Sequence, residues 1–241
     1  ARVDAIRPEI EVVSAGDPLL RAILLTSLML AADRVDSTTG VQMAYLKQWA
    51  PRASNDLELR YPPLLAGNGR AYLSDVADRV REAQVDLLYL DPPYNQHAYL
   101  SNYHIWETLV RWDSPEHYGV ACKRVDCRER RSQFNPCPRF HTAFRELVRG
   151  LNAENLLVSF NNEGFLQRPE LEAILGQHGA LTVIENDCKR YVGAQIGIYN
   201  PGGHKVGRVS HLRNKEFLFL VTPEPVSLGE LVPEEVTART A

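Results

Sequence analysis

Apolar residues follow helical spacing in the first part of this chain. From Asp17 to about Val35 the pattern predicts a helix, with Asp17 and Pro18 as cap and first turn. The residues that set the spacing are Leu20, Ile23, Leu24, Leu28 and Ala31. Residues 1–15 carry no usable start signal and are expected to form a frayed lead-in. A second short helix is expected at 41–49, followed by a connection from Pro51 to Gly69 with a short strand at 57–59.

After Gly69 the pattern changes to short apolar runs that alternate with amphipathic segments. The expected strands lie at 70–76 (with its exit turn), 85–90, 156–160, 181–185 and 216–221. The expected helices lie at 78–84, 103–112, 140–151 and 169–178. This alternation predicts an α/β fold with a mostly parallel sheet, whose last strand can enter antiparallel. The tail after Pro223 is expected to be disordered.

The apolar run Val85–Leu90 stops at two prolines, which can neither continue a sheet ladder nor enter a helix interior. A continuous apolar run of this length is typical of a buried parallel strand, and open α/β sheets bind ligands at the carboxyl ends of their strands. Asp91 therefore lies at a strand end, followed by the rigid turn Pro92-Pro93 and the aromatic ring of Tyr94. This arrangement makes Asp91 a candidate for chemistry.

Composition and charge narrow the class of protein only a little. The 241 residues are 44% hydrophobic and 24% charged, which is ordinary for a soluble globular protein of one domain with an insertion, or of two small domains. The net charge of -3 neither indicates nor excludes a nucleic-acid partner, because binding depends on where the cations lie. Four cysteines make no disulfide scaffold, and Leu19–Ala32, broken by Arg21, is too short to span a membrane. A cytoplasmic protein is expected.

The turn Asp91-Pro92-Pro93-Tyr94 resembles the catalytic motif of amino methyltransferases that use S-adenosylmethionine. Seven further motifs narrow the resemblance to adenine-specific (N6) DNA methyltransferases of the Dam-like alpha group, in the branch found in restriction-modification systems. They are Thr38-Thr39-Gly40-Val41, Ala44-Tyr45-Leu46-Lys47, Tyr94-Asn95, Asn102-Tyr103-His104, Glu107-Thr108, Ser159-Phe160-Asn161-Asn162-Glu163-Gly164 and Leu212-Arg213-Asn214-Lys215-Glu216, and the resemblance covers about 17–222.

This resemblance implies a Rossmann-like methyltransferase sheet with a helical insertion. It divides the chain into a helical insertion and target-recognition region (1–68), a catalytic domain (69–222) and a tail (223–241). The family begins with a Phe/Gly/Lys motif and a glycine-rich strand-to-helix loop that holds the cofactor, and neither is visible in this sequence. The glycines at 16, 40 and 67 are isolated. The N-terminal glycine-loop strand is therefore expected to be missing, either because the chain is a fragment or because its cofactor half is degenerate.

Four residues of the turn carry the implied chemistry. The exocyclic amine of adenine is a poor nucleophile because its lone pair is delocalised into the ring. Asp91 and the Pro92 carbonyl are expected to accept its two hydrogens, Pro93 to keep the turn rigid, and Tyr94 to stack on a base flipped out of the duplex. Positioning and electrostatics then carry the rate, and no metal is required. The alternative is a plain Asp-capped turn.

Asp75 and Val76 are the candidates for the cofactor's adenine, beside Asp91 itself. In the family an acidic residue at this place accepts the adenine amino group, and the next backbone N–H meets a ring nitrogen. Asp75 is expected to end a strand next to the central one. The alternative is an Asp that caps the following helix.

The expected substrate contacts lie further along the chain. Asn161 and Asn162 are expected either to line the target-base pocket or to form a turn. The stretch from Cys188 to Lys215 is glycine-rich and free of acidic residues, which favours contact with the phosphates of double-stranded DNA. Its candidate residues are Lys189, Arg190, Lys205, Arg213 and Lys215. A second cationic stretch, from Lys123 to Arg139, includes Arg124, Arg128, Arg130 and Arg131.

Three other readings stay open at this point. Cys122, Cys127, Cys137 and His141 suggest a zinc site, but their spacing is looser than Cys-x-x-Cys and no metal is expected. The methyl acceptor can be adenine in RNA or a protein amide instead of DNA. The chain can also be a catalytically incomplete DNA-binding remnant. The leading hypothesis is an S-adenosylmethionine-dependent DNA adenine methyltransferase, with a cognate restriction endonuclease as a possible partner.

Overall fold

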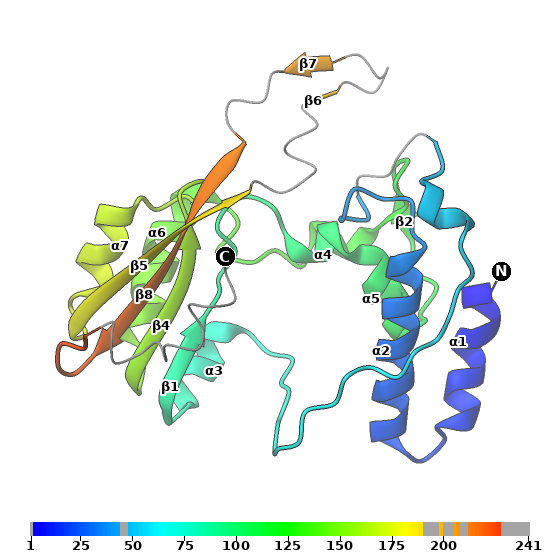
Figure 1. The fold of residues 1–241 in the computed structure, drawn as a ribbon, viewed down its shortest axis with the longest axis horizontal. Coiled ribbons are helices and arrows are strands. Elements are labelled where there is room, and N and C mark those ends of the chain that lie inside the picture. Colours follow the sequence, from blue (N-terminus) through cyan, green and yellow to red (C-terminus); the bar gives the residue numbers. More distant parts are fainter. Residues whose placement is uncertain (1, 44–47, 190–197, 200–204, 208–211, 228–241) are drawn as a thin grey trace. The chain divides into compact units, whose positions relative to one another are not determined.

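The computed structural model describes residues 2–43, 48–189, 198–199, 205–207 and 212–227, and the chain divides into two compact units (Figure 1). The helical unit comprises 1–71 and 98–131, and the sheet unit comprises 72–97 and 132–241. Packing therefore groups 98–131 with the N-terminal helices. The division after residue 68 that the sequence suggested stays a prediction about function.

The helical unit is built around a pair of helices, α1 (Arg2–Val13) and α2 (Pro18–Arg34). The Asp17 carboxylate accepts a hydrogen bond from the Leu20 N–H at 2.9 Å, so the predicted cap and helix are confirmed. The unit's other elements are η1 (Pro51–Ser54), α4 (Tyr99–Asn102), α5 (His104–Arg111), β2 (His117–Tyr118), β3 (Lys123–Arg124) and η2 (Val125–Arg128). Its core contains Ile10, Leu25, Leu28 and Leu109. No helix in the described residues is both long and apolar enough to cross a membrane.

The expectation of a frayed lead-in over 1–15 is wrong, because α1 is tied down by tertiary contacts. Arg7 is buried in α1, and it donates hydrogen bonds to the carbonyls of Leu109 (2.7 Å) and Val110 (2.9 Å). Those carbonyls lie at the C-terminal end of α5, where helix carbonyls lack partners within the helix. Arg7 also pairs with Glu11 at 2.6 Å. The two hydrogen bonds to α5 span 102 and 103 positions of sequence. They stabilise α1, although its sequence carries no local signal for the start of a helix.

The sheet unit contains one four-stranded sheet in the order β1-β4-β8-β5. Its strands are β1 (Val85–Leu90), β4 (Ala153–Asn161), β5 (Ala180–Lys189) and β8 (Arg213–Thr222). β1 and β4 pair parallel, whereas β8 lies antiparallel between β4 and β5. The sheet is thus mixed: three strands run in one direction, but two of its three pairings are antiparallel. β6 (Ile198–Tyr199) and β7 (Lys205–Gly207) form a separate antiparallel pair.

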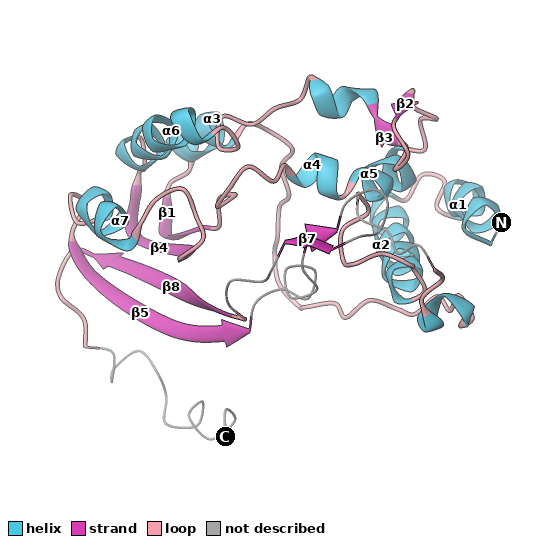
Figure 2. Cartoon of the chain, turned by 90° about the horizontal axis from the view of Figure 1, so that it is seen from above, coloured by secondary structure: helices cyan, strands magenta, loops and turns pink. Residues whose placement is uncertain are grey.

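Helices α3 (Val76–Glu82), α6 (Cys137–Arg149) and α7 (Arg168–Leu175) lie together beside the sheet (Figure 2). They bury its core-facing side chains on one face. The core includes Val80, Leu90, Phe140, Phe144, Leu156, Val158, Phe160, Leu171, Leu175, Phe217 and Phe219. The alternate positions of β1 are different: Val85, Leu87 and Tyr89 are 41%, 54% and 53% exposed. One sheet face is therefore packed, and the other leaves apolar side chains of β1 open.

Two expected strands are absent from the described residues. Residues 57–59 and 70–76 adopt no strand, and α3 begins at Val76. Leu73 is 96% exposed, and residues 70–74 pair with none of the strands that the structure describes. An apolar run needs a neighbouring strand to become a strand itself. The helix expected at 41–49 falls partly on residues 44–47, outside the described residues, and the flanking positions are turns and bends.

Candidate functional site

Asp91 and Ser159 meet because of the register between β1 and β4. Leu90 pairs with Val158 in a parallel ladder, so the next residue of each strand lies at the same edge of the sheet. The Ser159 hydroxyl lies 3.3 Å from Asp91 Oδ1. Asp91 is exposed. The predicted placement of a carboxylate at the carboxyl end of this strand is observed, but β1 is an outer strand of the described sheet and not a central one.

Tyr94 turns back over this strand end. Its hydroxyl donates to Asp91 Oδ1 at 2.8 Å and forms a short hydrogen bond with the Ser159 hydroxyl. Its ring packs against Phe160 with centroids 4.8 Å apart, and its carbonyl accepts from the Phe165 N–H at 2.8 Å. Burial, followed by the hydrogen bond to the Asp91 carboxylate, raises the pKa of Tyr94. The tyrosine is therefore neutral and fixed at both its ring and its hydroxyl.

The Tyr94 ring packs against a cluster of aromatic side chains. Phe160 contacts Phe140 (centroids 5.9 Å apart) and Phe144 (6.4 Å). Gly164 lies so close to the Phe160 ring that a Cβ at this position would be 2.2 Å from a ring carbon. From the sequence, Gly164 was only a turn residue. The structure adds that its missing side chain makes room for the ring beneath Tyr94.

Asp75 occupies the helix-capping position that the sequence left open as an alternative. Its Oδ1 accepts from the Ala77 N–H at 2.9 Å, and Val76 is the first residue of α3. Both residues are exposed. The expectation that Asp75 ends a strand is wrong, because residues 70–74 pair with nothing in the described part of the sheet. Its contact with a cofactor stays a prediction.

Asn161 and Asn162 serve the turn after β4. Asn161 Oδ1 accepts from the Glu163 N–H at 3.0 Å. Asn162 Oδ1 accepts from the Lys215 N–H at 2.9 Å, and its own N–H donates to the Lys215 carbonyl at 3.1 Å. The turn interpretation is thus the observed geometry, while a role in the target-base pocket stays a prediction. These bonds extend the pairing of β4 with β8 beyond its regular ladder.

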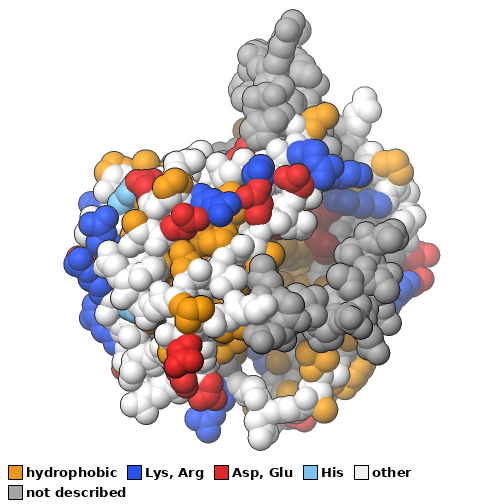
Figure 3. Space-filling model, turned by 60° about the vertical axis from the view of Figure 1, so that its left-hand side comes forward, with side chains coloured by type: hydrophobic (Ala, Val, Ile, Leu, Met, Phe, Trp, Pro, Cys, Tyr) orange, Lys and Arg blue, Asp and Glu red, His pale blue; other side chains and the backbone are white. Residues whose placement is uncertain are grey.

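The expected DNA-contacting cations differ in what they touch. Lys215 forms an ion pair with Glu185, which also pairs with Arg168 at 2.8 Å. Arg213 donates to the Asp187 carbonyl at 3.2 Å, and Lys189 is exposed at the end of β5. Arg190 and the side chain of Lys205 lie outside the described residues. On the face in Figure 3 described basic and acidic side chains are mixed across the upper part, and further basic side chains follow the left edge.

The second cationic stretch is largely structural. The Arg124 side chain is 3% exposed and makes two hydrogen bonds to Asp113, at 2.7 and 2.8 Å, and two to Asp126, both at 3.1 Å. The guanidinium holds the pKa of Asp113 down to about 2. Arg130 pairs with Glu107 at 3.0 Å. A buried, doubly paired guanidinium stabilises the β2–β3 segment and is not available to a phosphate.

The four residues of the suggested zinc site are divided between the two units. Cys122 and Cys127 belong to the helical unit, and Cys137 and His141 to the sheet unit. Within the described ranges, no group of three or more His, Cys, Asp or Glu side chains is placed to hold a metal ion. Cys127 is buried and donates to the Leu100 carbonyl at 3.7 Å, and burial raises the pKa of its thiol.

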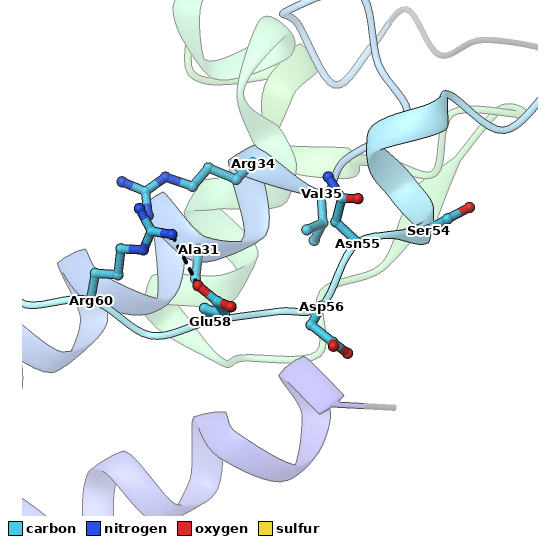
Figure 4. Close-up of a pocket in the computed structure, with 8 residues that line it drawn as sticks. All are labelled: Ala31, Arg34, Val35, Ser54, Asn55, Asp56, Glu58 and Arg60. Carbon is cyan, nitrogen blue, oxygen red and sulfur yellow. Dashed lines mark hydrogen bonds and ion pairs between the residues drawn. The ribbon is translucent and has the colours of Figure 1, made fainter.

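The helical unit carries a polar pocket of about 500 Å³ between the end of α2 and residues 54–60 (Figure 4). In this view Arg34 and Arg60 extend to the same side, and Arg60 pairs with Glu58 at 2.9 Å. The pocket is lined by Ala31, Arg34, Val35, Ser54, Asn55, Asp56, Glu58 and Arg60. It lies within the region 1–68 in which target recognition was expected.

Ser159 lies outside the set of catalytic and binding residues predicted from the sequence. It was visible only as part of a motif, and its hydroxyl gains a neighbour through the pairing of β1 with β4. Strand register is the signal that would have found it. Register follows from three-dimensional pairing and cannot be read from either strand alone.

Three curated proteins and one family model are similar to this chain. The Type II methyltransferase M.FokI of Planomicrobium okeanokoites is 37% identical over 66% of this chain and 25% of its own length. Modification methylase StsI of Streptococcus sanguinis is 30% identical over 76% of this chain and 29% of its own, and modification methylase LlaI of Lactococcus lactis subsp. lactis is 27% identical over 79% and 32%. The chain thus covers about a quarter to a third of these relatives, and no solved structure matches it. The family model for D12 class N6 adenine-specific DNA methyltransferases matches residues 2–161, and the chain therefore belongs to that family.

Proposed function

We propose that the protein transfers a methyl group from S-adenosylmethionine to the N6 amine of an adenine in duplex DNA. The observation that carries the proposal is the exposed Asp91 carboxylate at the carboxyl end of β1, fixed beside a Pro-Pro turn and two hydroxyl groups. Membership of the D12 class supports the choice of adenine N6 and of DNA.

The residues of the turn act on the acceptor amine. The Asp91 carboxylate accepts one hydrogen of the amine and the Pro92 carbonyl accepts the other, which directs the nitrogen lone pair away from the ring system. Pro93 keeps the turn rigid, and the half-buried Tyr94 ring provides a surface for a base that has left the duplex. The bound cofactor supplies an electrophilic methyl group on its sulfonium. The N–C bond would form as the S–C bond breaks, the cofactor would leave as a neutral thioether, and water would take the proton that the amine loses.

Asp75 and Val76 are proposed to bind the cofactor's adenine. Within the described residues Asp75 Oδ2 takes no hydrogen bond, because the helix cap uses only Oδ1. A free carboxylate oxygen fits the exocyclic amine of an adenine ring, and the exposed Val76 backbone fits a ring nitrogen. Asp91 is proposed to contribute on the methionine side of the cofactor.

The finer fold proposal is a Rossmann-like sheet whose N-terminal glycine-loop strand lies outside this chain. The exposed apolar row Val85, Leu87 and Tyr89 supports it, since parallel strands of α/β proteins are normally covered on both faces. The test is Leu87→Lys in the full-length protein. We expect it to lower the free energy of unfolding by about 2 kcal/mol. Unchanged stability would show that Leu87 stays exposed there, and would contradict a completed sheet.

The helical unit is proposed to recognise the target sequence, with the basic residues of the sheet unit on the DNA backbone. Lys189, Arg190, Lys205, Arg213 and Lys215 are the proposed phosphate contacts, and Arg34 and Arg60 beside the polar pocket are further cations in the recognition region. The names of the relatives, a type II methyltransferase and two modification methylases, support a restriction-modification role. A cognate restriction endonuclease and a cytoplasmic location belong to this proposal.

The test uses the full-length protein with radiolabelled S-adenosylmethionine and duplex DNA. We expect label in N6-methyladenine, and none when Asp91 is changed to alanine. Ribosomal RNA and a protein substrate run as separate acceptors, because a Pro-Pro-Tyr turn suits any planar amine. Label in RNA or protein but not in DNA would replace the proposed substrate. Full activity of Asp91→Ala would remove Asp91 from the chemistry.

A non-catalytic DNA-binding module is the second candidate, favoured by the missing glycine-rich loop. Calorimetry with S-adenosylmethionine and the full-length protein separates the two. Cofactor binding supports the enzyme, whereas binding of DNA without any binding of cofactor supports the module.

A further inference from the structure

A single oxygen of the Asp91 carboxylate receives both neighbouring hydroxyls. Tyr94 approaches Oδ1 at 2.8 Å and Ser159 approaches the same atom at 3.3 Å, while the two hydroxyls also contact each other. Oδ2 takes no hydrogen bond from any residue that the structure describes. Asp91 therefore has one engaged oxygen and one open oxygen.

The number of hydroxyl hydrogens limits which contacts of this cluster can be hydrogen bonds. Tyr94 and Ser159 each carry one hydroxyl hydrogen, but the cluster contains three contacts. Because the tyrosine oxygen is closer to Oδ1, the arrangement that uses both hydrogens best has Ser159 donating to Tyr94 and Tyr94 donating to Asp91. Each bond in such a chain polarises the next, and a hydrogen bond to a charged acceptor is stronger than one between neutral groups.

The supports of the two hydroxyls differ, and both are rigid. Ser159 lies within β4. The backbone of this strand is fixed by its pairing with β1 and β8. Tyr94 is held by Phe160 at its ring and by the Phe165 N–H at its carbonyl. Asp91 itself is exposed and follows the last residue of β1, and the two hydroxyls are its described side-chain contacts.

We propose that Ser159 is a positioning residue for methyl transfer: with the Tyr94 hydroxyl it fixes Oδ1 of Asp91 and leaves Oδ2 to accept the hydrogen of the target amine. This inference rests on the proposed function and assigns Ser159 a task within it. Tyr94 gains a second task, since its hydroxyl orients the carboxylate while its ring remains the surface for the base.

The activity test compares Ser159→Ala, Tyr94→Phe, the double variant and Ser159→Thr in the full-length protein. Single-turnover methyl transfer to duplex DNA is measured at saturating cofactor, together with the Kd of cofactor and of DNA. Ser159→Ala and Tyr94→Phe should each slow transfer by about ten- to a hundredfold, as expected for a hydrogen bond to a charged group. Both Kd values should stay unchanged. Thr182→Val in β5 is the control, since it removes a hydroxyl elsewhere in the sheet and should leave the rate unchanged.

The pattern among the variants separates positioning from packing. The double variant should lose less than the product of the two single losses, because the two hydroxyls belong to one hydrogen-bonded chain that ends on Asp91. Ser159→Thr should recover most of the rate, since it restores the hydroxyl. A wild-type rate in Ser159→Ala, a multiplicative double variant, or a Ser159→Thr protein as slow as Ser159→Ala would each overturn the proposal.

A second measurement does not depend on activity. Urea unfolding of the same proteins tests the hydroxyl cluster itself: the double variant should be destabilised by less than the sum of the two single variants, and Thr182→Val should add to either. If wild-type protein methylates no DNA, the proposed function fails while this cycle still tests the cluster. Strict additivity of Ser159→Ala and Tyr94→Phe would overturn it.

Discussion

Two aspartates in the same unit, Asp91 and Asp75, were both candidates at the ends of strands, and the structure treats them differently. Asp91 follows β1, which pairs with β4, and its carboxylate is engaged by two side chains from separate segments. Asp75 follows a segment without a strand partner, and its carboxylate contacts only the backbone two residues ahead. One carboxylate is held by tertiary structure and the other by its own helix.

The difference shows what a strand neighbour contributes to a site. Pairing brings Ser159 beside Asp91, and the core under β4 supplies Phe160 beneath Tyr94. Residues 70–74 have no such neighbour, so nothing in the described part of the chain surrounds Asp75 except its helix. The proposed site for the acceptor amine is thus supported by tertiary contacts, whereas the hydrogen bond that the structure describes for the Asp75 carboxylate is local to its helix.

The largest effect is expected beneath Asp91. Phe160→Ala removes a fully buried ring from the core and should lower the free energy of unfolding by about 3–5 kcal/mol. Val80→Ala, at a buried position of α3 on the Asp75 side, should cost about 2 kcal/mol. Urea unfolding measures both. Equal costs would mean that the two aspartates have equally firm supports, contrary to the comparison.

A smaller loss is expected from Gly164→Ala. The new Cβ would approach the Phe160 ring within contact distance, and neighbouring rings leave little room for it to move. Overpacking of this kind costs about 1–3 kcal/mol. Gly150→Ala is the matched control, because the nearest atoms lie 3.5 Å from its Cβ, an ordinary contact. If the two variants unfold at the same urea concentration, the ring beneath Tyr94 is less constrained than we infer.

Variants of Asp75 should separate its contribution to stability, as a helix cap, from its contribution to cofactor binding, as a carboxylate. Asp75→Ala removes the helix cap and should cost about 1 kcal/mol of stability, whereas Asp75→Asn keeps a capping side chain and should cost little. Both should weaken cofactor binding, because neither retains the carboxylate. Urea unfolding measures the stability of each variant, and calorimetry measures its cofactor affinity. Wild-type cofactor affinity in Asp75→Asn would contradict a role of the carboxylate in cofactor binding, and Asp75 would then act only as a helix cap.

The smallest effect concerns the far end of β8. Arg213→Ala should weaken DNA binding and reduce its salt slope by about one, as expected for one phosphate contact. Lys215→Ala should change the slope less, since Lys215 is already paired with Glu185. DNA binding titrated at several salt concentrations measures both. An unchanged slope in Arg213→Ala would move the DNA surface away from this part of the sheet.

The sequence predicted the elements that carry local signals. Helix α2 has its cap and spacing, and the strands β1, β4, β5 and β8 have their apolar runs. Helix α1 was missed because Arg7 fixes it through contacts with α5, and the strand at 70–76 was predicted wrongly because its pattern lacks a partner. Within the site, Asp91 and its turn could be predicted from the strand that ends there. The position of Ser159 in the site could not be predicted, because it depends on the register between β1 and β4. The structural role of Arg124 could not be predicted either, because its burial and its ion pair with Asp113 are not visible in the sequence.

The most direct test of the account is the single-turnover rate of methyl transfer to duplex DNA at saturating cofactor, measured for full-length Asp91→Asn and Asp75→Asn. The account predicts that Asp91→Asn loses rate on the order of a thousandfold even when cofactor saturates the protein. It predicts that Asp75→Asn keeps the wild-type rate once cofactor saturates. Loss of rate in Asp75→Asn with full rate in Asp91→Asn would contradict the assignment of the two carboxylates.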